Sequence, residues 1–328
     1  MAYINRTIKF KSSFLRVALS TFLLITVSYA MVGCSKKEPL VKIASNVWPG
    51  YELLYLAKEK NYFSENEVKL VEVPSATMCI QSLAAGTVEA AMLTLDEVLT
   101  AKAEGLNLKV VAILDLSMGA DVVMVNPSIK TLAGLKGKRI GVEQSAVGAV
   151  MLNALLEKSN ISVKDVNVIY LTVNQHLQAY IDKKVDALVT FEPVRTKLLK
   201  TGAKQIFDSS EIPGRIIDVL AVLPHALEQS PKTLRKIIKG HFKARNYYLT
   251  NQKEASNFLS KRLQLKPSEV ASSYDGLELP NLKDNHYWLD GEQSLLEKSA
   301  IKLNEIMVKA KLLKSDVLVN DLVIAEYL

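Results

Sequence analysis

The chain contains little cysteine, with only Cys34 and Cys79 among its 328 residues. Two cysteines allow at most one disulfide, which excludes a small scaffold held by several bridges. The four histidines lie far apart in the sequence, and no cysteine pair has zinc-ligand spacing, so we predict no metal site. Phosphate-binding glycine motifs of the Walker and dinucleotide types are also absent. We therefore expect no cofactor.

The net positive charge of the chain is small once the amino-terminal segment is left out of the count. The 41 Lys and Arg residues exceed the 34 Asp and Glu residues by seven, but four of these cations lie in residues 1–16. The remaining chain therefore has a net charge of +3, and no basic cluster with interleaved aromatic residues occurs in it. This balance does not indicate a nucleic acid as partner.

Residues 1–33 have the pattern of a secretory leader. Residues 1–16 are basic and contain no acidic residue, and residues 17–32 contain no charge at all. An apolar run of about 16 residues is shorter than the roughly 20 that a permanent spanning helix needs. A cleavable signal is therefore favoured over an uncleaved anchor, although the anchor remains an alternative.

The end of this leader, Met31-Val32-Gly33-Cys34, resembles the bacterial lipobox. That resemblance implies cleavage before Cys34 and attachment of lipid to it, with residues 34–40 as a tether. The alternative is an ordinary leader followed by a chance cysteine. With Cys34 lipidated no intramolecular disulfide remains, and we expect Cys79 to be a small buried hydrophobe.

Short apolar runs alternate with amphipathic stretches from residue 41 onward. This alternation predicts an α/β fold with largely parallel sheets, and no low-complexity linker separates its two halves. The expected strands are 41–45, 68–73, 90–93, 108–114, 121–126, 139–143, 167–172, 186–190, 203–207 and 218–223. The expected helices are 52–60, 76–86, 96–104, 147–158, 175–181, 193–202, 231–249, 252–262, 267–275 and 291–311.

Several segments have a familiar order and spacing. They are WPGY at 48–51, VPSAT at 73–77, LAAGTVEAAMLTLDEVL at 83–99, SMGAD at 117–121, LKGKRIGVE at 135–143, VDALVTFEPV at 185–194 and IFDSSEIPG at 206–214. Together they resemble the periplasmic substrate-binding proteins of ABC importers. Within that group the chain is similar to the branch of nitrate, taurine and alkanesulfonate binders and thiamine-precursor (NMT1/THI5-like) proteins.

The resemblance implies a two-lobed periplasmic-binding-protein fold of type II, with the ligand between the lobes. The first lobe would comprise residues 41–124 and 218–328, including the carboxyl-terminal helices, and the second would comprise residues 125–217. Ligand binding would close the lobes about a hinge, and a membrane permease would recognise the closed form. We expect a monomer that captures a small organic solute, such as a thiamine-precursor pyrimidine or a sulfonate, for an ABC permease and its ATPase.

The candidate ligand-binding residues follow strands or begin helices, where loops and free N–H groups converge. They are Trp48, Tyr51, Ser75, Thr77, Thr94, Ser117, Asp121, Gln144, Ser145, Thr190 and Glu192.

Each candidate also has a structural alternative. Trp48 and Tyr51 either wall a ligand or pack their loop on the sheet, and Ser75 either contacts ligand or caps a helix. Asp121 either binds a ligand amine or holds the hinge. Glu192 either receives a ligand N–H group or caps the following helix. Because no Lys or Arg stands among the candidates, a bare inorganic anion is disfavoured, and a ligand with an amine or a heteroaromatic ring is favoured.

Two other functions remain open. A lipoprotein of this fold can instead sense a ligand for a membrane signalling partner. An enzyme on the same fold is less favoured, because the similar yeast thiamine-precursor synthase depends on a cysteine-rich motif that this chain lacks, so we expect no catalysis. The chain is expected to be exported and lipid-anchored at the cell envelope. In a Gram-negative cell Ser35 would favour the outer membrane, away from a permease, which supports the sensing alternative.

Overall fold

The computed structural model describes residues 37–143 and 146–328 of the chain. Cys34, Ser35, Gln144 and Ser145 therefore lie outside the described residues, and the leader, the lipidation and the roles given to Gln144 and Ser145 stay predictions. Within the described ranges, no helix has the length and apolar character needed to cross a membrane.

The first sheet has six strands in the order β11-β4-β10-β3-β1-β2. Strands β1, β2 and β3 pair in parallel, whereas β10 pairs antiparallel with both β3 and β4. The short β11 closes the opposite edge, antiparallel to β4. The bounds are β1 (Val41–Ser45), β2 (Val68–Glu72), β3 (Ala90–Thr94), β4 (Lys109–Ser117), β10 (Ile217–Val222) and β11 (Leu277–Glu278).

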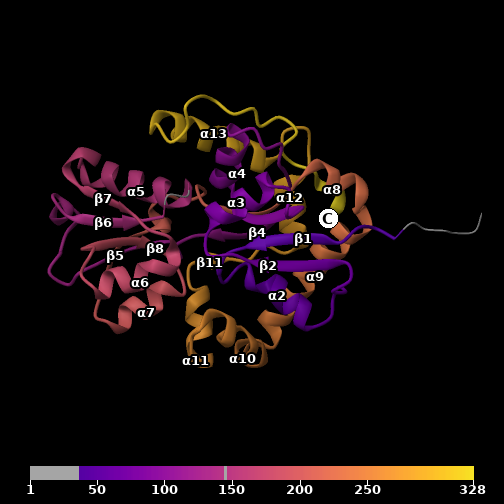
Figure 1. The fold of residues 1–328 in the computed structure, drawn as a ribbon, viewed down its shortest axis with the longest axis horizontal. Coiled ribbons are helices and arrows are strands. Elements are labelled where there is room, and N and C mark those ends of the chain that lie inside the picture. The colour runs from indigo at the N-terminus through magenta and orange to yellow at the C-terminus, as the bar shows by residue number, and fades with distance from the viewer. Residues whose placement is uncertain (1–36, 144–145) are drawn as a thin grey trace, which may run out of the picture. The chain divides into compact units, whose positions relative to one another are not determined.

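The second sheet has five strands in the order β7-β6-β8-β5-β9 and forms the other lobe in Figure 1. Strand β6 pairs in parallel with β7 and β8, and β5 pairs antiparallel with β8 and β9. The bounds are β5 (Val122–Val125), β6 (Arg139–Val142), β7 (Asn167–Tyr170), β8 (Ala187–Thr190) and β9 (Lys204–Asp208).

Most strands of each sheet run in one direction, as expected, but both sheets are mixed because β5, β10 and β11 run opposite to their neighbours. Parallel pairing is confined to strands joined by crossover helices, as the alternation of strands and helices predicts. The reversed strands β5 and β10 are the first strands after the chain passes from one sheet to the other. These passages contain no crossover helix that would return the chain in the same direction.

Helices cover both faces of each sheet (Figure 1). On the first sheet, α2, α9 and α10 contact one another below it in this view, and α3, α4 and α13 lie above it. On the second sheet α5 lies opposite α6 and α7. The α-helices are α2 (Glu52–Glu59), α3 (Ala76–Ala84), α4 (Leu95–Ala103), α5 (Ala146–Ser159), α6 (Val173–Ile181), α7 (Val194–Lys200), α8 (Pro224–Gln229), α9 (Pro231–Thr250), α10 (Gln252–Leu263), α11 (Pro267–Val270), α12 (Leu282–Leu289) and α13 (Leu295–Lys309). Short 3₁₀ turns occupy Leu132–Leu135, Val163–Asp165, Ser209–Glu211, Ala271–Tyr274 and Ala325–Tyr327.

Most helices match their expected positions, but the carboxyl-terminal region differs. The single helix expected over 291–311 is α13, and α12 precedes it as a helix that the sequence pattern did not predict. Each has its own capping box, Asn281 with Asp284 and Ser294 with Glu297, which satisfies free N–H groups of the first turn.

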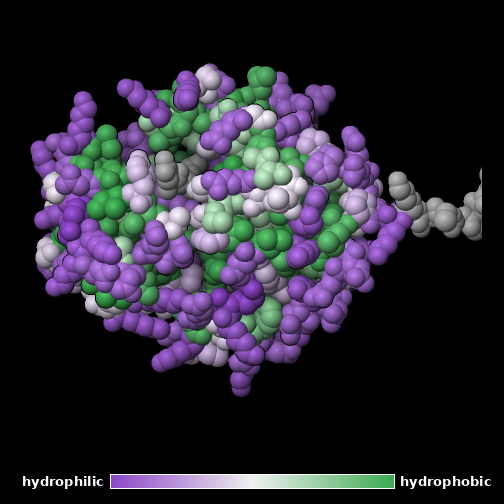
Figure 2. Space-filling view, viewed as in Figure 1, coloured by the Kyte–Doolittle hydropathy of each residue, from purple (hydrophilic) through white to green (hydrophobic). Residues whose placement is uncertain are grey.

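Two apolar clusters form the core, one on each face of the sheets. Strand residues alternate between them, so that Ile43 belongs to one cluster and its neighbour Ala44 to the other. Each cluster continues from the first sheet to the second. On the side drawn in Figure 2, hydrophilic side chains cover much of the surface and hydrophobic ones show between them. The strongly exposed Tyr170, Tyr287 and Leu318 come from separate parts of the chain.

Two crossing segments, residues 118–121 and 209–216, connect the lobes. The Ser209 hydroxyl lies 2.7 Å from the Ser117 hydroxyl and accepts the Gly119 N–H at 2.7 Å, and the Ser209 N–H donates to the Asp121 carbonyl at 2.9 Å. The first crossing falls slightly before the expected boundary after residue 124, because β5 belongs to the second sheet. These hydrogen bonds join the two crossings into one hinge.

Candidate ligand-binding cleft

A pocket lies where the two lobes face each other beside the hinge. It contains about 320 Å³ of space between the protein atoms, part of it open to solvent, and it is narrow. The first lobe supplies Asn46, Trp48, Tyr51, Ala76, Thr94, Glu97 and Asp218, the crossing supplies Asp121, and the second lobe supplies Glu143, Val147 and Phe191.

A row of polar side chains crosses the first sheet at this pocket. In the register of the sheet, Asp218 of β10 lies beside Thr94 of β3 on one side and Asp115 of β4 on the other. Directly opposed carboxylates repel each other and destabilise a sheet. The Tyr51 hydroxyl donates to one Asp218 oxygen at 2.5 Å, whereas the other Asp218 oxygen accepts no hydrogen bond.

Trp48 is held in the pocket by Asp115. The indole N–H donates to both Asp115 oxygens at 3.2 Å, and the ring meets Phe191 of the second lobe edge-on, with centroids 5.3 Å apart. Gly50 makes this arrangement possible, because a Cβ at that position would lie 1.7 Å from Asp115 Oδ2. The expected role of Trp48 and Tyr51 as walls agrees with their positions in the pocket.

Glu143, at the end of β6, faces the amino terminus of α3 across the cleft. The N–H groups of Ala76 and Thr77 and the Ser75 hydroxyl favour its charged form and lower its pKa, but burial dominates and raises that pKa to about 8. No hydrogen bond of ordinary length and angle joins these groups to the carboxylate, so both of its oxygens stay unsatisfied. We therefore regard the contact as electrostatic.

Burial raises the pKa of the other carboxyl groups in and behind the pocket. The pKa of Asp115 rises to about 7 and that of Asp121 to about 6. The pKa of Asp218 lies well above its ordinary value, first because of burial and then because of the adjacent Asp115. Such perturbed carboxyl groups gathered in a cleft are typical of functional sites.

The remaining candidates of the first lobe lie around this pocket with different contacts. Thr94 lines it, and its hydroxyl makes no hydrogen bond. Ser75 caps α3 by accepting the Met78 N–H at 3.3 Å, so its structural alternative is realised. Thr77 follows in the same turn and contributes its N–H group toward Glu143.

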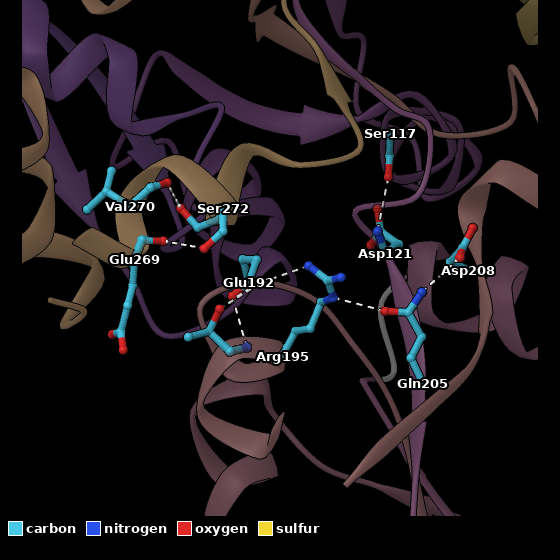
Figure 3. Close-up of polar contacts among 11 residues, drawn as sticks. Ser117, Asp121, Glu192, Arg195, Gln205, Asp208, Glu269, Val270 and Ser272 are labelled. Carbon is cyan, nitrogen blue, oxygen red and sulfur yellow. Dashed lines mark hydrogen bonds and ion pairs between the residues drawn. The ribbon is translucent and has the colours of Figure 1, made fainter. Parts of the chain in front are cut away.

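Ser117 and Asp121 lie together at the hinge (Figure 3). The Ser117 hydroxyl accepts the Asp121 N–H at 3.1 Å, which leaves Ser117 engaged in the crossing rather than in the pocket. The Asp121 backbone joins the two crossings, and its side chain lines the pocket with Oδ2 unpaired, so contact with a ligand amine stays a prediction.

Glu192 points into its own helix and not into the pocket. Its carboxylate accepts the Thr196 N–H at 3.1 Å and the Thr196 hydroxyl at 2.9 Å, and it pairs with Arg195 at 3.4 Å (Figure 3). Arg195 in turn donates to Gln205, which donates to Asp208. The geometry therefore gives Glu192 the helix-capping alternative.

Thr190 lines a smaller extension of the pocket in the second lobe, which shares Asp121, Glu143, Val147 and Phe191 with it. The Thr190 hydroxyl lies 3.1 Å from His176 Nδ1. Burial lowers the pKa of His176 to about 4, so this buried imidazole is neutral at physiological pH.

Sequence reasoning missed Glu97, Asp115, Glu143 and Asp218. Asp115 and Asp218 stand inside the apolar strands VVAILDLS and IDVLAV, where an isolated carboxylate is costly. That interruption was the available signal. Glu143 directly precedes the predicted Gln144. Glu97 could not be recognised in this way, because acidic residues are common in the first turn of a helix.

Metal and thiol chemistry find little support within the described residues. No group of three or more His, Cys, Asp or Glu side chains there has an arrangement suited to a metal ion. Cys79 is fully buried, as expected, and burial raises the pKa of its thiol well above the ordinary value, which keeps it protonated.

A larger groove opens between the lobes next to Val47. It contains about 1170 Å³ of space, part of it open to solvent, and is lined by residues of α6 and α7 on one side and of α10 on the other. Arg262 lies in it but is already paired with Glu52 and, at 2.6 Å, with Glu72. This groove adjoins the loop that carries Trp48.

Known proteins with similar sequences include solute binders. A protein of Escherichia coli named as an aliphatic sulfonates-binding protein is 24% identical over 219 residues, which cover 66% of this chain and 68% of that protein. A Haemophilus influenzae protein named for thiamine biosynthesis is 27% identical over 159 residues, covering 47% of this chain and 50% of that protein.

Solved structures share the fold over most of the chain. The alkanesulfonate-binding protein SsuA from Xanthomonas axonopodis pv. citri, bound to MOPS, superimposes with a TM-score of 0.75 at 19% identity, covering 88% of this chain and 99% of that one. The periplasmic aliphatic sulphonate binding protein SsuA from Escherichia coli gives a TM-score of 0.66 at 20% identity over 87% and 96% of the two chains. The expected two-lobed α/β fold is thereby confirmed.

The NMT1/THI5-like family model matches residues 48–255, which include the first crossing, the whole second lobe and most of the residues that line the pocket. With this match over more than half of its length, the chain belongs to the NMT1/THI5-like family.

Proposed function

We propose that this protein is an exported solute-binding receptor that captures a small molecule between its lobes and delivers it to an ABC importer. The observation that carries the proposal is the pocket beside the hinge, to which both lobes contribute side chains. Such a pocket changes shape when the lobes rotate, so ligand binding is linked to the conformation that a membrane partner would recognise.

The relatives support this role. Those named above are sulfonate binders or carry a thiamine-biosynthesis name, and the solved neighbours are periplasmic or ligand-bound binding proteins. Export by the leader and lipid attachment at Cys34 belong to the same proposal. Mass spectrometry of the amino-terminal peptide from the membrane-bound protein would test both. The protein then acts as a monomer tethered near its partner.

Ligand binding by the full chain, purified in mild detergent, tests the proposal. A screen of amines, pyrimidines, flavins, amino acids and sulfonates should include a solute that raises Tm by several degrees and contracts the protein in small-angle scattering. Stabilisation follows from binding to the folded state alone. If no class of solute stabilises or contracts the protein, the receptor proposal fails.

Sensing is the second candidate, and the expected sorting signal at Ser35 favours it, because an outer-membrane receptor would be separated from a permease. Adjacent genes separate the two roles: a permease and an ATPase support transport, whereas a sensor kinase or cyclase supports sensing. Loss of solute uptake on deletion of the gene would decide for transport.

A further inference from the structure

We propose that the cleft binds a small organic cation that carries N–H groups, such as a protonated amine, amidine or guanidine, and that it rejects sulfonates. This inference rests on the proposed function, because it names the class of solute that the receptor captures. It also departs from the ligands named for the sulfonate-binding relatives.

The first argument is the set of unsatisfied carboxylate oxygens in the pocket. Asp121 and Glu143 are each 4% exposed and Asp218 is 2% exposed, so bulk solvent barely reaches them. Four of their oxygens accept no hydrogen bond: Asp121 Oδ2, Asp218 Oδ2 and both oxygens of Glu143. A buried carboxyl oxygen without a hydrogen bond destabilises the fold, most strongly when the group is ionised. A ligand with N–H donors would satisfy them.

The second argument is the absence of basic side chains at the pocket. Among the described residues that line the pocket and its extension, the titratable side chains other than Tyr51 are the acidic ones and His176, which is neutral. The basic residues Arg262 and Lys197 line the adjoining groove and not the pocket: Arg262 pairs with Glu52 and Glu72, and Lys197 donates to the Gln264 side-chain oxygen at 3.4 Å. A sulfonate would therefore meet carboxylates without a countercharge, which is strongly unfavourable in a desolvated site.

The third argument concerns the amino terminus of α3, where an anion would otherwise bind. Free N–H groups and the partial positive charge at the amino terminus of a helix favour anions. Across the cleft, α3 presents the Ala76 and Thr77 N–H groups, but Glu143 of the second lobe faces them. The protein thus supplies its own anion at this helix end when the lobes approach each other.

The fourth argument distinguishes an organic cation from a metal ion. Aromatic rings of Trp48, Tyr51 and Phe191 line the pocket, and aromatic faces attract organic cations. The described carboxylates do not gather into a metal-type cluster. The narrow space restricts the ligand to few atoms unless the lobes open. Because carboxylate oxygens need donors, cations with N–H groups are favoured over quaternary ones.

Isothermal titration of the full chain in detergent tests the inference. The probes are putrescine and guanidinium as N–H cations, tetramethylammonium as a cation without N–H groups, methanesulfonate and nitrate as anions, and Ca²⁺ and Zn²⁺ as metals. We expect an N–H cation to bind at least 100-fold more tightly than methanesulfonate and at least tenfold more tightly than tetramethylammonium.

A pair of variants connects the binding to the pocket. Glu143→Gln should weaken the binding of the N–H cation at least tenfold without lowering Tm, because it removes an unpaired carboxylate and not a structural contact. Asp186→Asn is the matched control: Asp186 is a partly buried carboxylate of the same lobe, paired with Arg139 outside the pocket. Its affinity for the cation should equal that of the native protein.

The outcomes separate the inference from the function on which it rests. Equal or tighter binding of methanesulfonate or nitrate overturns the cation inference and leaves the receptor proposal standing. Preference for a metal ion or for tetramethylammonium overturns the N–H cation. If no probe and no solute of the wider screen binds, the receptor proposal fails and the inference fails with it.

Discussion

Gly50 and Asp115 depend on each other at the scale of single residues. The carboxylate occupies the space in which any other residue at position 50 would place its Cβ, and Trp48 Nε1 lies 3.1 Å from the same point. The glycine therefore serves a close approach between backbone and carboxylate. Because Asp115 positions Trp48, which lines the pocket, a change at Gly50 reaches the pocket through both side chains.

Gly50→Ala should reduce the affinity for the preferred solute at least tenfold and lower the unfolding free energy by about 1–3 kcal/mol, as overpacking does. Asp115 must move away from the added methyl group, and Trp48 must follow it. Calorimetric titration and denaturant unfolding measure the two effects. Gly134→Ala is the control, since its Cβ would meet Ile129 Cγ2 at 3.4 Å and Thr131 Oγ1 at 3.8 Å, which are ordinary contact distances. Equal behaviour of the two variants would contradict the coupling.

Residue types alone could not reveal the acidic site. Trp48, Tyr51, Thr94 and Asp121 were predicted because each follows a strand, and they line the pocket. Asp115 and Asp218 come from strands far apart in the chain, and only the register of β4 against β10 brings them together. Glu192 was predicted from the sequence but does not line the pocket. Its place before Pro193 fits both a ligand contact and a helix cap, and its hydrogen bonds with Thr196 support the cap.

At the scale of elements, the hinge includes a third segment besides the two crossings. The turn before β11 lies against the first crossing, where the Met118 N–H donates to the Gly276 carbonyl at 2.7 Å. A Cβ on Gly276 would lie 2.6 Å from the Gly119 carbonyl carbon and 2.7 Å from the Ala120 nitrogen. Backbone therefore packs directly on backbone at the point about which the lobes rotate.

Gly276→Ala should destabilise the protein by about 1–3 kcal/mol and reduce its ligand-induced contraction in small-angle scattering. The position has a φ of +82°, and the added Cβ also pushes against residues 119 and 120. Gly214→Ala separates these causes, because Gly214 has a φ of +73° with nothing within 4 Å of its Cβ. Equal losses of stability and contraction in both variants would assign the effect to backbone strain alone.

The strand and helix pattern was predictable to within a few residues, because periodicity depends on local burial. The antiparallel entry of β10 between β3 and β4 was not, since it depends on the path of the chain between lobes. Helix α12 was missed for a related reason. Its Asn285 side chain accepts the Ile113 N–H at 2.7 Å and donates to the Ile113 carbonyl at 3.1 Å, so long-range contacts support it.

At the scale of the whole molecule, the buried carboxyl groups link stability and binding to pH. Their folded pKa values lie above the unfolded ones, so the folded state binds more protons and its stability falls as pH rises through those values. The buried His176 and His241, with pKa values of about 4, act oppositely but only up to the ordinary histidine pKa of about 6.5. The window from pH 6.5 to 8.5 therefore isolates the carboxyl groups.

The ligand-free protein should lose about 1–3 kcal/mol of stability between pH 6.5 and 8.5, measured by denaturant unfolding. In the pocket the loss comes from Asp115, with a pKa of about 7, and Glu143, with a pKa of about 8, together with Asp218. Tyr51 and the neutral His176 face the same space and stay uncharged in this window, and the Glu97 side chain also lines it. Glu52, with a pKa of about 7, contributes outside the pocket.

The Glu143→Gln variant should lose less stability than the native protein between pH 6.5 and 8.5. Over the same window, the affinity of the native protein for an N–H cation should increase as the carboxyl groups release their protons. A stability that rises from pH 6.5 to 8.5, or an affinity that falls, would contradict the assignment of these groups.

The contact between Gly50 and the Asp115 carboxylate also offers a way to sort relatives by sequence alone. A homologue with a side chain at the position of Gly50 has no room for a carboxylate at that of Asp115 in this arrangement. Such a protein must hold its tryptophan by other means and need not select the same solutes. Two positions, one in a loop and one in a buried strand, can therefore divide the family into groups of different specificity before any ligand is tried.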